Sequence, residues 1–187
     1  WNHPQLQGVS FDTQVSSGLK TAKAHGVPGD HILEKGQQIL IDFGVNFQYY
    51  KSDITRTFFA SHPCSQLEEM YKVVLEAQLT AIEKAAPGIP ISQIDLAARN
   101  VIAKAGYGEY FNHRTGHGLG LDIHETPNIY DINEDILQEG MVFTVEPGIY
   151  LPQMGGVRVE DDVLITASGH HIFTDFPKEF SQIILEK

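Results

Sequence analysis

The chain has 187 residues, of which 42% are hydrophobic, so its length and composition suit one folded domain rather than a disordered segment. It carries 13 lysines and arginines against 24 aspartates and glutamates, which gives a formal net charge of −11. This excess of negative charge argues against nucleic acid or an anionic membrane as a partner. The lone Cys64 excludes an internal disulfide, and no apolar run approaches the roughly 20 residues that span a bilayer. These features favour a cytoplasmic protein.

The first 35 residues are polar and leave room for short strands only. Within them His25 precedes Gly26 and Pro28, a combination that is typical of a turn. From these residues alone, His25 is expected to be a surface histidine.

Two aspartates lie in apolar runs that the sequence predicts to pair as strands. Asp42 interrupts a buried-strand pattern and Asp53 opens a second apolar run. Residues 45–52 connect the two runs as an antiparallel hairpin or meander, which places the aspartates opposite each other. Two such carboxylates ionise together only when cations neutralise them. Thr55 shares the face of Asp53 and is placed to orient it, whereas the alternative pairs Asp53 with Arg56.

Two amphipathic helices follow. Ser65-Gln-Leu-Glu68 matches a capping box, and apolar residues then recur at helical spacing until Pro87-Gly88. A second helix is expected from Ser92 to Gly106. Both are expected to pack on a sheet as structural elements, and the sequence indicates no chemistry in them.

The stretch 113–125 holds three of the nine histidines, at His113, His117 and His124. Glycine at every second position from 116 to 120 opposes a helix and lets the backbone approach its neighbours closely. An irregular strand here would place His113 and His117 on one face. This density of histidines favours a metal or catalytic site over hydrogen-bonded core histidines.

Two further acids lie at apolar strands. Glu146 ends an apolar run just before a Pro-Gly turn, and Glu160 alternates with valines on the same face as Arg158. Asp161 and Asp162 continue the acidic run, and the default expectation for them is a solvated face. Glu160 itself is expected to be buried.

The four strand carboxylates and His117 make an oxygen-rich ligand set that suits two divalent ions rather than one tetrahedral zinc. Two ions about 3.5–4 Å apart can hold a hydroxide between them. Because metal-bound water loses its proton near neutral pH, such a site needs no serine or cysteine nucleophile.

The motifs around these residues resemble those of the pita-bread metallopeptidases, and within them the Xaa-Pro group of prolidase and aminopeptidase P. The similarity runs from about Gly8 through nearly the whole chain. Its segments are Ile-Asp42-Phe-Gly, Ser-Asp53-Ile-Thr-Arg-Thr, Gly-His117-Gly-Leu-Gly, Asp-Ile-His124-Glu-Thr-Pro, Val-Glu146-Pro-Gly-Ile-Tyr and Val-Arg-Val-Glu160-Asp. The resemblance implies an α+β pita-bread (creatinase/aminopeptidase-like) fold, with a curved antiparallel sheet and helices on its outer face.

The resemblance also implies roles. Two divalent ions, Mn²⁺ with Co²⁺ or Zn²⁺ as alternatives, would be bound by Asp42, Asp53, His117, Glu146 and Glu160. Glu146 would also transfer protons, and His124 would donate a hydrogen bond to the oxyanion or the scissile carbonyl. His25 and His113 would line the proline pocket, which reverses the surface assignment of His25. Arg158 would anchor the substrate or the Asp53 side of the site.

The activity implied is hydrolysis of Xaa-Pro bonds in small peptides with proline in second position, by a homodimer. An arginine that grips the free carboxylate of a dipeptide would favour prolidase, and the absence of arginine between Glu125 and Met141 weakens the case for the eukaryotic-type arrangement. The compact 150–156 loop resembles that of bacterial dipeptidases, so Xaa-Pro dipeptidase (prolidase) is expected rather than aminopeptidase P. Methionine aminopeptidase shares the five ligands but typically lacks a counterpart of His113, and creatinase lacks the metals. A non-catalytic pita-bread binding module stays open as an alternative, although no ligand is lost.

Residues 1–187 are expected to form one metallopeptidase catalytic domain that is truncated at its N-terminus, because no helix pair precedes the strands of Asp42 and Asp53. The expected consequence is an uncovered apolar face on Ile39–Phe43 and Ile54–Phe59, on the side away from the aspartates.

Overall fold

The computed structural model describes residues 3–24, 26 and 29–185, and its elements follow the expected order of strands, two helices and more strands. The first group is β1 (Leu6–Val9), β2 (Gln14–Ser17), the 3-10 helix η1 (Gly18–Ala22), β3 (Gln38–Phe43), β4 (Val45–Phe47), β5 (Tyr50–Lys51) and β6 (Ile54–Phe59). The helices are α1 (Ser65–Glu83) and α2 (Ser92–Lys104). The last group is η2 (Gly108–Tyr110), β7 (Gly116–Gly118), β8 (Glu125–Ile129), β9 (Val142–Val145), β10 (Gly148–Leu151), β11 (Gly155–Arg158), β12 (Asp161–Thr166), β13 (Gly169–Ile172) and η3 (Phe180–Gln182).

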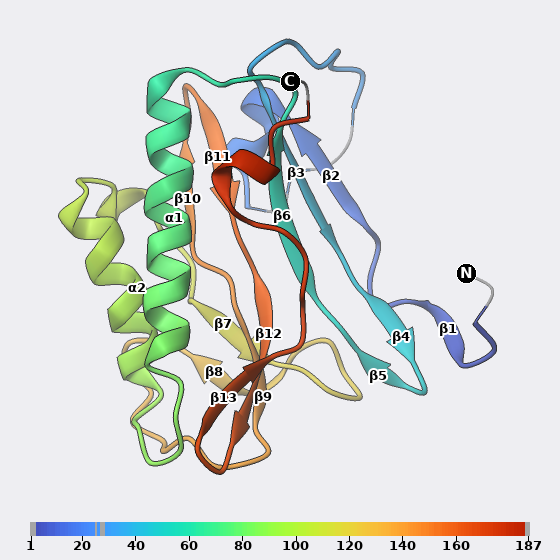
Figure 1. Cartoon of the computed structure of the whole chain (residues 1–187), viewed down its shortest axis with the longest axis vertical. Coiled ribbons are helices and arrows are strands. Elements are labelled where there is room, and N and C mark those ends of the chain that lie inside the picture. The colour runs from blue at the N-terminus through green and yellow to red at the C-terminus, as the bar shows by residue number, and fades with distance from the viewer. Residues whose placement is uncertain (1–2, 25, 27–28, 186–187) are drawn as a thin grey trace.

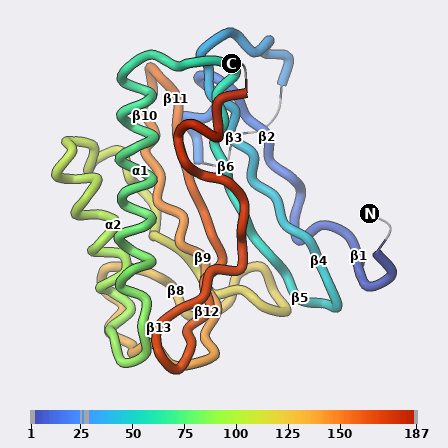
Figure 2. Tube along the Cα trace, viewed as in Figure 1, coloured from blue at the N-terminus to red at the C-terminus, as the bar shows by residue number. Residues whose placement is uncertain are grey.

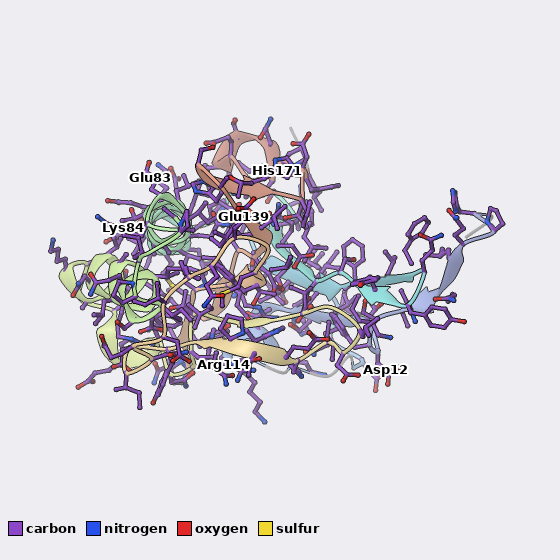
Figure 3. The ribbon with its side chains drawn as sticks, turned by 90° about the horizontal axis from the view of Figure 1, so that it is seen from below. Asp12, Glu83, Lys84, Arg114, Glu139 and His171 are labelled. Atoms are coloured by element: carbon purple, nitrogen blue, oxygen red, sulfur yellow. The ribbon has the colours of Figure 1, made fainter. Side chains whose placement is uncertain are left out.

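The two aspartate strands pair as the sequence predicts. β3 lies between β2 and β6 in an antiparallel sheet, but Asp42 stands opposite Thr55 and not opposite Asp53 as predicted, because Asp53 precedes the first residue of β6. β4 and β5 occupy the connection between β3 and β6 and pair with β1 to form a second small sheet. Figure 3 shows this sheet extending from the body as an arm.

The histidine and glutamate strands form the other half of the molecule. Their antiparallel order is β13-β12-β9-β7-β8, and the pair β10-β11 lies beside it. Glycine is required in β7, because a Cβ on Gly116 would lie 1.8 Å from the carbonyl oxygen of Thr144. Gly116 thus permits the close approach of β7 to β9, and Gly118, on which a Cβ would lie 2.3 Å from Thr126 O, permits that of β7 to β8.

The helices pack against each other, and α1 also contacts β9, β10 and β11 (Figure 1). The second helix begins at Ser92 as predicted, and Gly106 follows its end with a positive φ of 86°. The predicted capping box is wrong. Ser65 is already helical, and Cys64 occupies the N-cap without a side-chain hydrogen bond.

Both helices lie on the half of the molecule that holds β9–β12 (Figure 1). On the outer face of the β2-β3-β6 sheet, Val15 is 41% exposed and Phe43 39% exposed, while Ile39, Ile41 and Ile54 are half-buried. In the described part of the chain neither α1 nor α2 covers this face. The C-terminal segment covers its β6 side, because Arg56 is 2% exposed and donates to Phe176 O and the Phe58 ring meets that of Phe176, so the expected exposure is met only in part. The truncation itself stays a prediction.

The segment after β13 returns between α1 and β6 (Figure 2). Tyr71 of α1 donates from its hydroxyl to the carbonyl oxygen of Lys178, and the N–H of Phe59 in β6 donates to Ile183 O. This segment therefore ties the helix layer to the aspartate sheet. Neither helix in the described ranges is both long and apolar enough to cross a membrane.

Candidate metal centre

A cavity of about 380 Å³ opens between the two halves, and both contribute residues to its lining. The residues predicted to bind metal or substrate that line it are Asp42, Asp53, His113, His117, His124, Glu146, Arg158 and Glu160. His25 lies outside the described residues, so its role stays a prediction. The fold thus brings together side chains that are more than 100 positions apart in the sequence.

Three of these side chains come close enough to share one ion. Single ligand atoms of Asp53, His117 and Glu160 lie within 4.8 Å of one another, and all three residues are buried. Nε2 of His117 is 3.8 Å from Asp53 Oδ2 and 3.3 Å from Glu146 Oε1. His117 therefore faces acids from both halves of the molecule.

Threonines hold two of the glutamates in place. Thr144 Oγ1 donates to Glu146 Oε1 at 3.1 Å, and Thr55 Oγ1 donates to Glu160 Oε2 at 2.6 Å. The expected partner of Thr55 was Asp53, two residues earlier in the chain. Its partner in the structure comes instead from across the interface between the halves. Such hydrogen bonds fix the orientation of carboxylates around a metal site.

Asp42 has a cationic partner. Its Oδ2 lies 2.6 Å from Nη2 of Arg158. The guanidinium also donates to Tyr150 OH at 3.1 Å and to Thr55 Oγ1 at 3.1 Å. Arg158 was expected to face the Asp53 side, but in the described residues its ion pair is with Asp42. Its substrate-anchoring role stays a prediction.

Unsatisfied oxygens point to cations at this site. In the described part of the protein, Oδ1 of Asp42, Asp53 and Asp162 is buried without a hydrogen-bond partner. A buried carboxylate oxygen without a partner is costly, and such atoms are rare in folded proteins. The donor set of carboxylates plus one imidazole therefore fits divalent cations.

The pKa values follow from burial and mutual repulsion. Burial, together with repulsion from Asp42 and Glu146, raises the pKa of Asp53 to about 9. Burial raises the pKa of Glu146 to about 7 and that of Glu160 well above its usual range. Burial lowers the pKa of His117 to about 4, which keeps the imidazole in the neutral, metal-binding form.

The acids after Glu160 are a correction to the sequence analysis. Asp161 and Asp162 were expected on a solvated face, but they are 0% and 4% exposed. Asp161 pairs with Arg56 at 2.7 Å, so the alternative pairing of Arg56 with Asp53 is wrong. Oδ2 of Asp162 accepts the backbone N–H of Asp53 at 3.1 Å. Asp162 thus supports a predicted ligand, and the sequence signal for it was only its place in an apolar strand.

The two described histidines beside the centre differ in setting. His113 is half-buried, and its Nε2 lies 3.0 Å from the hydroxyl of Tyr150. His124 is exposed, and its ring centroid lies 4.4 Å from that of His117. Tyr150, which joins His113 to Arg158, was not singled out from the sequence. Its position directly after the Glu146 turn was the available signal.

Fold and donor set together define a pita-bread metallopeptidase domain. A family model described as metallopeptidase family M24 matches residues 2–167, and the chain belongs to this family. It is 49% identical over 170 residues to a Xaa-Pro dipeptidase of Pyrococcus horikoshii, an alignment that covers 91% of this chain and 48% of that protein.

Solved structures agree on the fold. The prolidase from Pyrococcus horikoshii superposes with a TM-score of 0.91 at 48% identity, over 94% of this chain and 50% of that one. An X-Pro aminopeptidase from Thermotoga maritima superposes with a TM-score of 0.90 at 43% identity, over 93% and 49%. The predicted family and fold are therefore confirmed. The chain spans about half the length of these relatives.

Proposed function

We propose that this chain hydrolyses Xaa-Pro peptide bonds with two divalent ions and acts as a Xaa-Pro dipeptidase. The observation that carries the proposal is the meeting of five predicted ligands at one cavity where two of them, Asp42 and Asp53, each carry a buried oxygen without a hydrogen-bond partner among the described residues. Similarity to a Xaa-Pro dipeptidase supports the substrate class. The predicted ligands are Asp42, Asp53, His117, Glu146 and Glu160.

When bound, two divalent ions supply Lewis acidity for the scissile carbonyl and acidify the attacking water. Glu146 is the proposed proton carrier, because its carboxylate lies 3.3 Å from Nε2 of His117 and is held in place by the hydroxyl of Thr144. His124 lies beside His117 and donates to the developing oxyanion. His113, together with His25, holds the prolyl residue.

Manganese is the proposed ion, with cobalt or zinc as alternatives, because the donor set is mostly oxygen. A homodimer and a cytoplasmic location complete the proposal. The net charge of −11 supports the expectation that neither nucleic acid nor an anionic membrane is a partner.

A dipeptidase needs a cation for the free carboxylate of its substrate, and the cavity offers two arginines. Arg158 is occupied by Asp42, Tyr150 and Thr55. Arg114 lines the same cavity, is half-buried, and donates through Nη1 to Asn128 Oδ1. In Figure 3 it lies on the side opposite Glu83 and Lys84 at the end of α1. Arg114 is therefore the better candidate for pairing with that carboxylate.

The test combines metal analysis with cleavage assays. Protein loaded with Mn²⁺ is expected to bind two ions and to cleave a Xaa-Pro dipeptide, with a matched Xaa-Ala dipeptide as the control. Efficient cleavage of Xaa-Pro tripeptides but not dipeptides would favour aminopeptidase P, to which one of the similar structures belongs. A folded, metal-loaded protein that cleaves neither would favour a binding module.

A further inference from the structure

Helix α2 carries an ion pair that reaches the segment beside the cavity. Asp95 is fully buried, and its carboxylate accepts two hydrogen bonds from Arg99, at 2.8 Å from Nε and 3.0 Å from Nη2. Oδ1 of Asp95 also accepts from the backbone N–H of Thr115 at 3.1 Å and from its hydroxyl at 2.7 Å. One carboxylate thus joins the helix to the residue that precedes β7.

Arg99 uses its remaining donors on the same segment. Nη1 donates to Phe111 O at 3.1 Å, and Nη2 donates to His113 O at 3.0 Å. The guanidinium stacks over the Phe111 ring at 4.4 Å, and that ring meets the imidazole of His113 edge-on at 5.0 Å. The pair therefore fixes residues 111, 113 and 115 at once.

The segment 111–115 needs such support because it has no helix or strand of its own. Its backbone polar groups must find other partners when they are buried. Thr115 extends the connection further, because its carbonyl oxygen accepts the backbone N–H of Glu146 at 2.8 Å. A continuous path of contacts then runs from α2 to His113 and to the backbone of Glu146.

We propose that Asp95 and Arg99 are positioning residues, which hold His113 at the cavity in the orientation that grips the substrate. The inference rests on the proposed function, because it assigns His113 to substrate binding. It also revises the expectation that the helices carry no chemistry. Neither residue of the pair lines the metal cavity, so any effect on the reaction passes through the 111–115 segment.

The chain contains a matched control for this pair. Lys72 and Glu68 on α1 have the same four-residue spacing at 2.6 Å, and Lys72 lies over the Phe180 ring at 5.3 Å. This pair is solvent-accessible and neither residue lines the cavity, so an Arg-for-Lys exchange there alters only a surface contact. The charge-conserving exchanges Arg99→Lys and Lys72→Arg therefore test position rather than charge.

Lysine at 99 can keep the ion pair with Asp95 but cannot reproduce the planar fork that bonds Phe111 O and His113 O together. In the metal-loaded protein, R99K is expected to raise KM for a Xaa-Pro dipeptide about 10-fold or more, with metal content unchanged. K72R is expected to leave kcat and KM unchanged. A merely structural defect would instead lower kcat in proportion to the folded fraction and leave KM unaltered.

A double-mutant cycle with His113→Ala completes the test. If the pair acts through His113, R99K adds no further loss in the H113A background, and additive losses would overturn the proposal. NMR signals of the His113 ring give a second readout, and they are expected to shift in R99K and not in K72R. Should the wild type prove inactive on Xaa-Pro peptides, the proposed function fails, while unshifted ring signals in R99K would overturn the positioning role separately.

Discussion

Glu160 and Asp161 are neighbours in the sequence, both are buried, and their surroundings differ completely. Asp161 accepts hydrogen bonds from Arg56, Lys178, Gln78 and Thr174, and its pKa is lowered by Arg56 and Lys178 despite its burial. Glu160 faces Asp53, Glu146 and Asp42, and its pKa is raised by burial and by these acids.

The difference separates a structural acid from a ligand. Asp161 is neutralised by the protein itself and ties β6, β12, α1 and the C-terminal segment together. The acids of the cavity are under-neutralised, because four carboxylates, Asp42, Asp53, Glu146 and Glu160, line it with two arginines, Arg114 and Arg158. A divalent cation is therefore expected to stabilise the acids of the cavity and not Asp161. Substitutions that neutralise one acid at a time should therefore act in opposite ways in the two clusters.

The largest expected effect is on activity at the cavity. Asp53→Asn is expected to lower turnover of a Xaa-Pro dipeptide by more than about 10³-fold, above the 10²–10³ that one oxyanion donor contributes. The same change should reduce metal content measured by elemental analysis. It should also raise the melting temperature of the metal-free protein at pH 8, because a buried, repelled acid is removed. A lowered melting temperature would contradict the proposed difference between the clusters.

Asp161→Asn is expected to lower stability and to leave metal binding intact. Removing one partner of a buried ion pair costs about 3–5 kcal/mol, because Arg56 and Lys178 lose their counter-charge. Urea denaturation is expected to show this loss in metal-free and metal-loaded protein alike. The folded fraction should retain its metal stoichiometry, and loss of metal at full folding would place Asp161 in the metal centre.

His124→Ala examines the side of the cavity that supplies hydrogen bonds rather than ligands. Metal content is expected to stay at the wild-type level, while kcat falls by about 10²–10³, the usual effect of losing one oxyanion donor. Steady-state kinetics with matched metal analysis measures both. Wild-type kcat in this variant would remove His124 from the mechanism.

The pH dependence of stability gives the smallest effect and sharpens the comparison further. Burial raises the pKa of Asp53 from 3.8 to about 9 and that of Glu146 from 4.5 to about 7. Between the ordinary and the raised pKa of each residue, the metal-free native state therefore binds more protons than the unfolded chain. Stability therefore falls as pH rises through this window. The pKa of His117 is lowered to about 4, so its contribution to stability rises with pH, but only below the usual histidine value of 6.5.

Calorimetry in chelator is accordingly expected to show a falling melting temperature from pH 6.5 to 9. Mn²⁺ should reverse the fall, since saturation at 100-fold above Kd contributes about 2.7 kcal/mol. Asp161 affects stability only at low pH. Because its pKa is lowered, its contribution is lost as pH falls below the ordinary aspartate value of 3.8. A flat profile above pH 6.5 would contradict the raised pKa of Asp53.

Much of the fold was predictable from local patterns. Continuous apolar runs located β3 and β6, helical spacing located α1 and α2, and alternating glycines indicated the irregular strand of His117. The strand acids and histidines were also recognisable, because a polar residue among apolar neighbours has few structural explanations. The N-cap of α1 was not predictable in this way. Ser65-Gln-Leu-Glu68 matches a capping-box motif, but serine also occurs within a first helical turn, and the helix in fact begins at Ser65.

The sequence by itself determined which residue types lie on which face, and hence that several acids share a buried side of a sheet. Only the tertiary structure decided their partners: Arg158 with Asp42, Thr55 with Glu160, and Arg56 with Asp161. These partners are separated by more than 100 residues, and neither periodicity nor spacing records which strands meet across the cavity. The same holds for Arg99, whose contacts with Phe111 and His113 depend on where α2 packs.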